Sequence, residues 1–334
     1  MLKEIQIPLT LFILGLFLSI IFSQDKIQSI KELYKYITGI SLLLAGFSLR
    51  KEDTEKVIYC LVAASVLISL LAIYQYFFGF RHLLSYVHTQ GISDNFTLDY
   101  ISQRRVFFPF VTPNILAGYL VMMIPLALAV GNNILFIVPL SIALLLTKSI
   151  GALISLFCGL AAYFYLKGEL RRKGIIFLGG ISVIILIMFI IRANTQKQHL
   201  LPLFSTVMRL NYWEKGLEII KLHPFAGVGL GNFNLAQSRY AHNSYLQLWA
   251  EIGTLGIFAF LWLVWSLLRI RVIRLKEKAK DRISSGIFLA SIIFLLHNLI
   301  DFTFFLPEVC LLWWVILAAS FTSLGLKSEK TYLD

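Results

Sequence analysis

The chain of 334 residues has the composition of an integral membrane protein, because 58% of its residues are hydrophobic and only 14% are charged. Soluble domains are about 45–50% apolar and about 25% charged, so a soluble globular class is excluded. The net charge of +12 does not require nucleic-acid binding, since cytoplasmic loops of membrane proteins are rich in Lys and Arg.

Apolar runs follow one another along the chain, and each can cross roughly 30 Å of hydrocarbon as a helix. The runs are continuous rather than alternating, which predicts helices and not a β-barrel. We therefore predict an all-α, polytopic membrane helix bundle with about ten transmembrane helices, in a single integral membrane domain over residues 1–334. The expected spans lie near 5–23, 33–49, 57–80, 109–130, 133–147, 149–166, 174–191, 244–268, 284–301 and 304–325.

Basic residues predict the orientation of these spans, because loops rich in Lys and Arg stay in the cytoplasm. They gather in 50–56, 167–173 and 269–283, and Lys327 and Lys330 lie in the C-terminal tail. Both termini are therefore expected to be cytoplasmic. The loops 81–105 and 192–243 are then extracytoplasmic.

The long outer loop 192–243 is expected to carry an amphipathic helix. Between 206 and 221, the apolar residues Leu210, Trp213, Leu217 and Ile220 recur at spacings of three and four, which favours a helix lying on the membrane surface. Pro224 should end it just before His223.

Arg209 lies four residues before Trp213, so its guanidinium could stack on the indole. An interfacial anchor is the alternative for this arginine. The glycines of 227–233 follow no strand, so they predict tight turns rather than a dinucleotide site.

The segment 239–245 directly precedes a span and combines residue types suited to catalysis. Were it helical, Arg239 and His242 would share a face. Histidine is the usual general base near neutral pH, and arginine binds phosphate oxygens through a fork of donors. A histidine that only caps or packs at the start of the span is the alternative.

Four further polar positions near the outer boundary are candidates. Glu251 is a carboxylate inside a span, which requires a partner or a function, and Asp301 follows His297 by one turn. Arg104 and Arg105 precede the fourth span, where they could bind phosphate or anchor to headgroups, and Asn114 follows. No metal motif is present and the cysteines lie far apart, so we predict no metal and no cofactor.

Three segments in this order resemble the O-antigen ligase and polymerase superfamily, the Wzy-like enzymes. They are 105–118, 223–233 and 242–256. The resemblance implies a bacterial inner-membrane enzyme that moves a glycan from undecaprenyl diphosphate to an acceptor hydroxyl, such as lipid A-core, without a metal. By the same likeness, His242 would be the base, Arg209 would act with it, and Arg104, Arg105 and Arg239 would hold the donor diphosphate, with Asn114, Glu251 and Asp301 in support.

One position departs from the family, which often has an arginine in a Thr-x-Ser-Arg-Gly motif where this chain has Ile150. Lys148 could replace that arginine only if its segment is not helical, and Arg104 could supply the missing charge instead. A Wzy-type polymerase would use the same donor site as a ligase. A polysaccharide or lipid transporter would require internal repeats and midplane charges, and a non-catalytic envelope-assembly protein is a further alternative.

Overall fold

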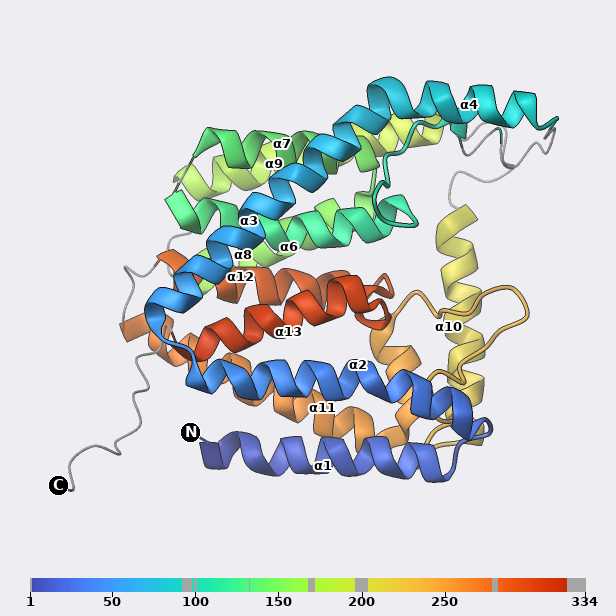
Figure 1. The fold of residues 1–334 in the computed structure, drawn as a ribbon, viewed down its shortest axis with the longest axis vertical. Helices are drawn as coiled ribbons and strands as arrows, with labels where there is room; N and C mark the ends of the chain where they lie inside the picture. The colour runs from blue at the N-terminus through green and yellow to red at the C-terminus, as the bar shows by residue number, and fades with distance from the viewer. Residues whose placement is uncertain are drawn as a thin grey trace. The chain divides into compact units, whose positions relative to one another are not determined.

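The structure is a computed structural model that describes residues 2–91, 98, 101–131, 133–167, 172–195, 204–277 and 282–322. These residues are mainly helical (Figure 1). Outside the helices, the described chain contains an isolated bridge between Leu235 and Ser238 and no strand. The all-α fold class is therefore confirmed.

A helix occurs at each of the predicted spans. Their bounds are α1 Leu2–Ile21, α2 Lys26–Ala45, α3 Lys51–Tyr74, α6 Pro113–Gly131, α7 Ile134–Thr147, α8 Ile150–Leu166, α9 Arg172–Thr195, α11 Ser244–Glu277, α12 Arg282–His297 and α13 Pro307–Thr322. Two more helices lie in the predicted outer loops, α4 (Phe80–Thr89) and α10 (Phe204–Leu222).

Five helices of the described chain are long and apolar enough to cross a membrane, and four shorter apolar helices accompany them. A multi-pass membrane protein is therefore indicated, while the count of about ten crossings stays a prediction. The orientation also stays a prediction, since the helices are identified as candidate spans by length and composition only. Of the basic segments, 168–171, 278–281 and 323–334, with Lys327 and Lys330, lie outside the described residues.

The chain forms two compact units, and each is described by itself. The first unit comprises Met1–Glu55, Ser205–Phe288 and Asn298–Asp334, and the second comprises Lys56–Phe204 and Leu289–His297. This division by packing does not test whether the chain is one integral membrane domain.

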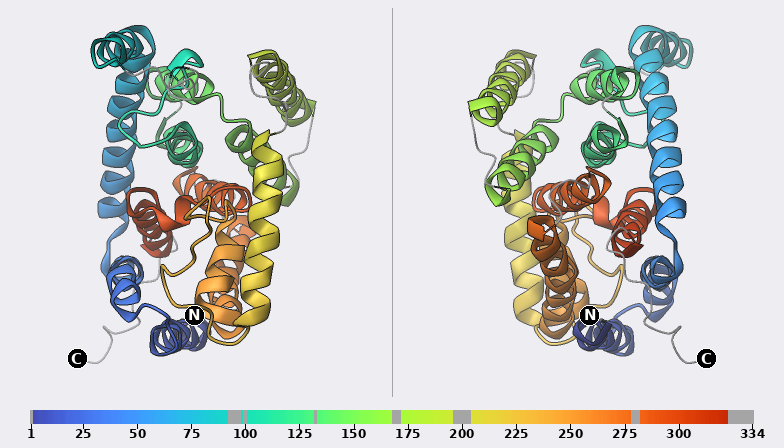
Figure 2. Two further views of the ribbon diagram at one scale, coloured as in Figure 1. Left: turned by 90° about the vertical axis from the view of Figure 1, so that its right-hand side faces the viewer. Right: turned by 90° about the vertical axis from the view of Figure 1, so that its left-hand side faces the viewer.

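In the first unit, α1 packs against α11 and α2 packs against α13. Small residues allow this closeness: a Cβ on Gly15 would lie 2.8 Å from the Cα of Gly256. Helix α10 runs crosswise to α1, α2, α11 and α13 (Figures 1 and 2). Such a direction is expected of a helix lying on a membrane surface, and α1 and α11 are long and apolar enough to cross that membrane.

The second unit is built around α6, which is buried along most of its length and packs against α7 and α8. Helix α8 also contacts α9. Helix α3 continues through a π turn, η2 (Gln75–Gly79), into α4. A short segment, 101–112, then leads into α6.

Candidate functional site

His242 lies just before α11 with a left-handed backbone, φ = +53°. This conformation is rare outside glycine and marks functional positions when the surroundings hold it. Both neighbours are fixed: the Ala241 N–H donates to Oε1 of Gln247, and Oδ1 of Asn243 caps α11 by accepting from the Tyr245 and Leu246 N–H groups. The backbone therefore presents the imidazole in one orientation.

Aromatic rings surround the imidazole of His242. Tyr212 of α10 stacks on it at 5.8 Å between centroids, and Phe302 meets it edge-on at 4.7 Å. Tyr240 in turn stacks on Phe302 at 4.1 Å. Nδ1 of His242 is buried and finds no hydrogen-bond partner among the described residues, so the aromatic rings are the contacts that position this side of the imidazole.

Arg209 approaches the same place from α10, where its guanidinium lies 3.9 Å from the carboxylate of Asp301. The Asp301 side chain is 2% exposed, and its other contacts include a hydrogen bond accepted from the Phe302 N–H at 2.8 Å. Arg209 thus meets a buried carboxylate rather than the Trp213 ring. Three residues far apart in the sequence, His242, Arg209 and Asp301, form one cluster.

The pKa of His242 is lowered from its usual value. Burial is the largest cause, because a desolvated imidazole resists protonation. The carboxylate of Asp301 acts in the opposite direction and the guanidinium of Arg209 lowers the pKa further. His242 is therefore neutral near pH 7 and able to accept a proton.

The glycine-rich segment 224–233 packs into a break in α11. Gly253 has φ = +67° and ψ = −177°, which interrupts the helix. The carbonyls of Ala250 and Glu251 accept hydrogen bonds from the Val228 and Gly229 N–H groups. Gly227, Gly229 and Gly231 all have positive φ, so the predicted tight turns are confirmed.

Glu251 holds this loop through its side chain as well. Its carboxylate accepts from the Gly231 N–H at 2.9 Å and from Nε2 of Gln247 at 3.0 Å. Gln247 also accepts from the Ala241 N–H. Glu251 therefore supports His242 indirectly, through Gln247 and the backbone.

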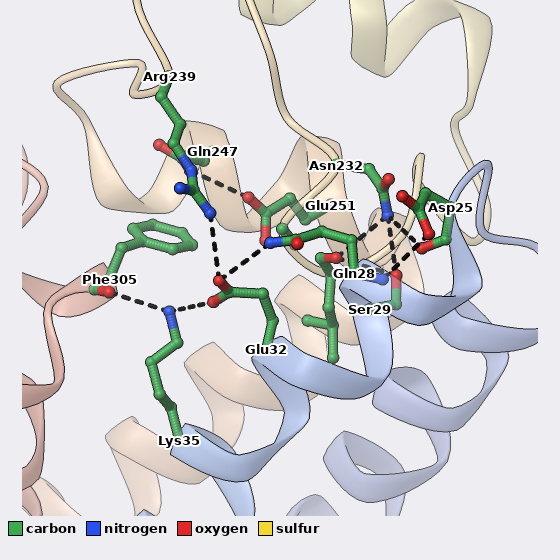
Figure 3. Close-up of polar contacts among 12 residues, drawn as sticks. Asp25, Gln28, Ser29, Glu32, Lys35, Asn232, Arg239, Gln247, Glu251 and Phe305 are labelled. Carbon is green, nitrogen blue, oxygen red and sulfur yellow. Dashed lines mark hydrogen bonds and ion pairs between the residues drawn. The ribbon is translucent and has the colours of Figure 1, made fainter.

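Arg239 lies apart from the His242 cluster, against α2. The condition for a shared helical face with His242 is not met, because Asn243 caps α11 and the helix begins only at Ser244. Arg239 is 3.4 Å from Glu32, which also pairs with Lys35 (Figure 3). A role for Arg239 in donor binding stays a prediction.

In the second unit, Arg105 is held in place by two acceptors. Its Nε donates to the Thr147 carbonyl at 2.9 Å, and an Nη donates to Oδ1 of Asn114 at 2.9 Å. Asn114 was predicted as a supporting residue, and it contacts Arg105 directly. Arg104 beside it is exposed and has φ = +46°.

The polar side chain of Gln75 anchors the segment that follows these arginines. It lies in the π turn η2, and its Oε1 accepts from the N–H groups of Phe107 and Phe108 at 2.8 and 3.0 Å. A π turn inside a helix is often found at functional sites. The signal in the sequence was a glutamine inside an otherwise apolar run. The motifs did not point to Gln75, nor to Tyr212, Phe302 and Gln247.

Within the described ranges, no group of three or more His, Cys, Asp or Glu residues is arranged to hold a metal ion. Metal independence therefore stays a prediction.

A comparison with family models adds an independent finding to this geometry. Residues 135–261 match the model of the O-antigen ligase family, named Wzy_C. This segment includes Arg209, His242 and Glu251, whereas Arg105 and Asp301 lie outside it. No curated protein matches the sequence. Over residues 135–261, the chain is thus similar to the O-antigen ligase family, and the resemblance that its motifs indicated is confirmed there.

Proposed function

We propose that this protein transfers a glycan from undecaprenyl diphosphate to an acceptor hydroxyl on the extracytoplasmic side of the bacterial inner membrane. The family match supports a ligase- or polymerase-type function. The observation that carries the proposal is His242, a histidine of lowered pKa outside the apolar spans, beside Arg209 and Asp301.

In the proposed step, neutral His242 takes the proton of the acceptor hydroxyl. The acceptor oxygen then bonds to the anomeric carbon of the glycan, and the diphosphate leaves with the electron pair of the broken bond. A positioned base contributes roughly a hundredfold to ten-thousandfold to such a reaction. Asp301 stabilises the imidazolium that forms.

Arg209 is proposed to stabilise the negative charge of the leaving diphosphate, because preplaced guanidinium donors act strongly where charge develops. Arg104 and Arg105, with Asn114 orienting Arg105, are proposed ligands of the donor diphosphate. The His242 cluster belongs to the first unit and the two arginines belong to the second, so each group is tested by variants of its own residues.

The test is glycan transfer by the purified full-length protein from a defined undecaprenyl-diphosphate donor, in the presence of EDTA. His242→Ala should lower the rate about a hundredfold or more. His88→Ala is the matched control, because His88 is an exposed histidine of α4, and it should leave the rate unchanged. Unchanged transfer by folded His242→Ala would remove the base from the proposal.

The acceptor that supports transfer distinguishes the two members of this reaction class. Lipid A-core or another separate hydroxyl acceptor would identify a ligase, whereas a second lipid-linked glycan would identify a Wzy-type polymerase. Wild-type protein that transfers to no acceptor would instead favour a transporter or an envelope-assembly protein.

A further inference from the structure

The turn between α7 and α8 places Lys148 beside the arginine segment of the second unit, the residues 103–106 that contain Arg104 and Arg105. Helix α7 ends at Thr147 and α8 begins at Ile150, so Lys148 lies between two helices with φ = +52° and ψ = +33°. The condition under which Lys148 could take the place of a family arginine is therefore met.

Backbone contacts lock this turn to the arginine segment. Nζ of Lys148 donates to the Gln103 carbonyl at 2.7 Å. In return, Arg105 donates to the Thr147 carbonyl and the Val106 N–H donates to the Leu146 carbonyl at 3.2 Å. Lys148 is thereby held beside Arg104 and Arg105 although like charges repel each other.

Within the described residues, the helices around the turn offer Lys148 no carboxylate partner. Helices α6, α7 and α8 contain no Asp, Glu, Lys, Arg or His, and within the described part of the chain no acidic group pairs with Lys148. Burial, followed by Arg105 and Arg104, lowers the pKa of Lys148. An ammonium has three donors, and the Gln103 carbonyl occupies one, so two are available to an anion.

We propose that Lys148 is a third phosphate-binding cation alongside Arg104 and Arg105, and that it binds the diphosphate of the lipid-linked donor. The identity of the donor rests on the proposed function, whereas the three-cation site for phosphate oxygens stands on the geometry alone. The lysine also gives the site a titratable charge, which arginine cannot provide.

Binding of inorganic pyrophosphate to the full-length protein in phosphatidylcholine nanodiscs tests the site without requiring transfer. Lys148→Gln should weaken binding about tenfold or more, as expected for loss of a charge-assisted hydrogen bond. Lys167→Gln, at the other end of α8, is the control and should bind as wild type does. Equal affinity of wild type and folded Lys148→Gln would overturn the proposal.

The pH dependence gives a readout that a merely structural lysine would not change. Wild-type affinity should fall as pH rises through the range below the usual pKa of lysine, because the lowered pKa of Lys148 brings the loss of its charge into that range. Lys148→Arg should restore binding and flatten this dependence, while the titration of pyrophosphate itself is common to both proteins. Identical pH profiles for wild type and Lys148→Arg would contradict a titrating lysine ligand.

Two last measurements complete the test. The first distinguishes a lipid-linked donor from a lipid headgroup as the source of the phosphate, and the second distinguishes failure of this inference from failure of the proposed function. Undecaprenyl diphosphate should compete with pyrophosphate, whereas competition by phosphatidylglycerol alone would overturn the donor assignment in favour of a lipid headgroup. If wild type binds pyrophosphate through Lys148 but transfers no glycan, the proposed function fails and the phosphate site stands. If transfer occurs and Lys148→Gln binds pyrophosphate normally, only the present inference fails.

Discussion

Arg104, Lys148 and His242 have φ values of 46°, 52° and 53°, and they are the non-glycine residues of positive φ in the described chain. A left-handed residue costs roughly 1–2 kcal/mol, so the hydrogen bonds on either side must hold it. Each of the three carries a basic side chain to which we assign a role in binding or catalysis. Their chemical types could be selected from the sequence, whereas their strained backbones could not, because the partners that impose them are distant in the chain.

If Arg209 and Asp301 both act electrostatically on His242, replacing each of them should shift the pKa of His242 in opposite directions. The neutral imidazole is the active base, so transfer should fall as pH drops through the pKa of His242. Arg209→Gln removes a repelling cation, which raises that pKa and moves the acid limb to higher pH. Asp301→Asn removes the anion that favours the imidazolium, which lowers the pKa and moves the limb to lower pH.

The same shifts can be measured without activity. Diethyl pyrocarbonate modifies neutral imidazole, and mass spectrometry of the peptide containing His242 gives its rate at each pH. Shifts of the same sign in the two variants would contradict the electrostatic account. Arg209→Lys keeps the cation, so the pKa of His242 should stay lowered as in the wild type. The transfer rate should nevertheless fall about tenfold or more, because the fork of donors is lost.

At the scale of elements, the hydrophobic pattern predicts where helices lie but not where they break. Apolar runs and Pro224 gave the positions of α11 and the end of α10. The interruption at Gly253 was not predicted, since a single glycine inside an apolar run is also compatible with a continuous helix. The break depends on segment 224–233 binding the carbonyls it exposes, which is a tertiary effect.

Gly253→Ala should destabilise the protein in detergent by about 2 kcal/mol or more. Alanine is strained at φ = +67°, and its Cβ would lie 2.0 Å from the Phe225 carbonyl oxygen. Gly179→Ala in α9 is the matched control, because a Cβ there meets nothing within 4 Å. The control should be neutral or slightly stabilising. Equal melting temperatures for the two variants would show that the break is not required.

At the scale of the whole molecule, labelling with a membrane-impermeant maleimide in intact cells tests the predicted topology. In a background lacking Cys60, Cys158 and Cys310, Gln237→Cys should react because segment 192–243 is expected outside. Arg269→Cys should react only after the membrane is permeabilised. The reverse pattern would place the His242 cluster on the cytoplasmic side and contradict the proposed function.

The order of the motifs indicated the family, and the charge distribution gave an orientation that can be tested. The family likeness named both Asn114 and Arg105 as site residues, whereas the hydrogen bond that joins them is seen only in the structure. The contact between Arg209 and Asp301 could not be predicted, because it joins α10 to the segment after α12. Likewise, the partner of Arg239 is Glu32 of α2, and no periodicity within one segment relates such residues.

The packing of α1 on α11 has a consequence for synthesis of the chain. Ser19 donates to the Glu251 carbonyl, the Gln24 N–H donates to the Val228 carbonyl, and Asn232 donates to Ser23. The glycine-rich segment is thus closed by residues from the beginning of the chain. Helix α1 must therefore wait in the lipid while residues 56–204 of the second unit are made, and its packing against α11 can form only once translation has passed Gly256.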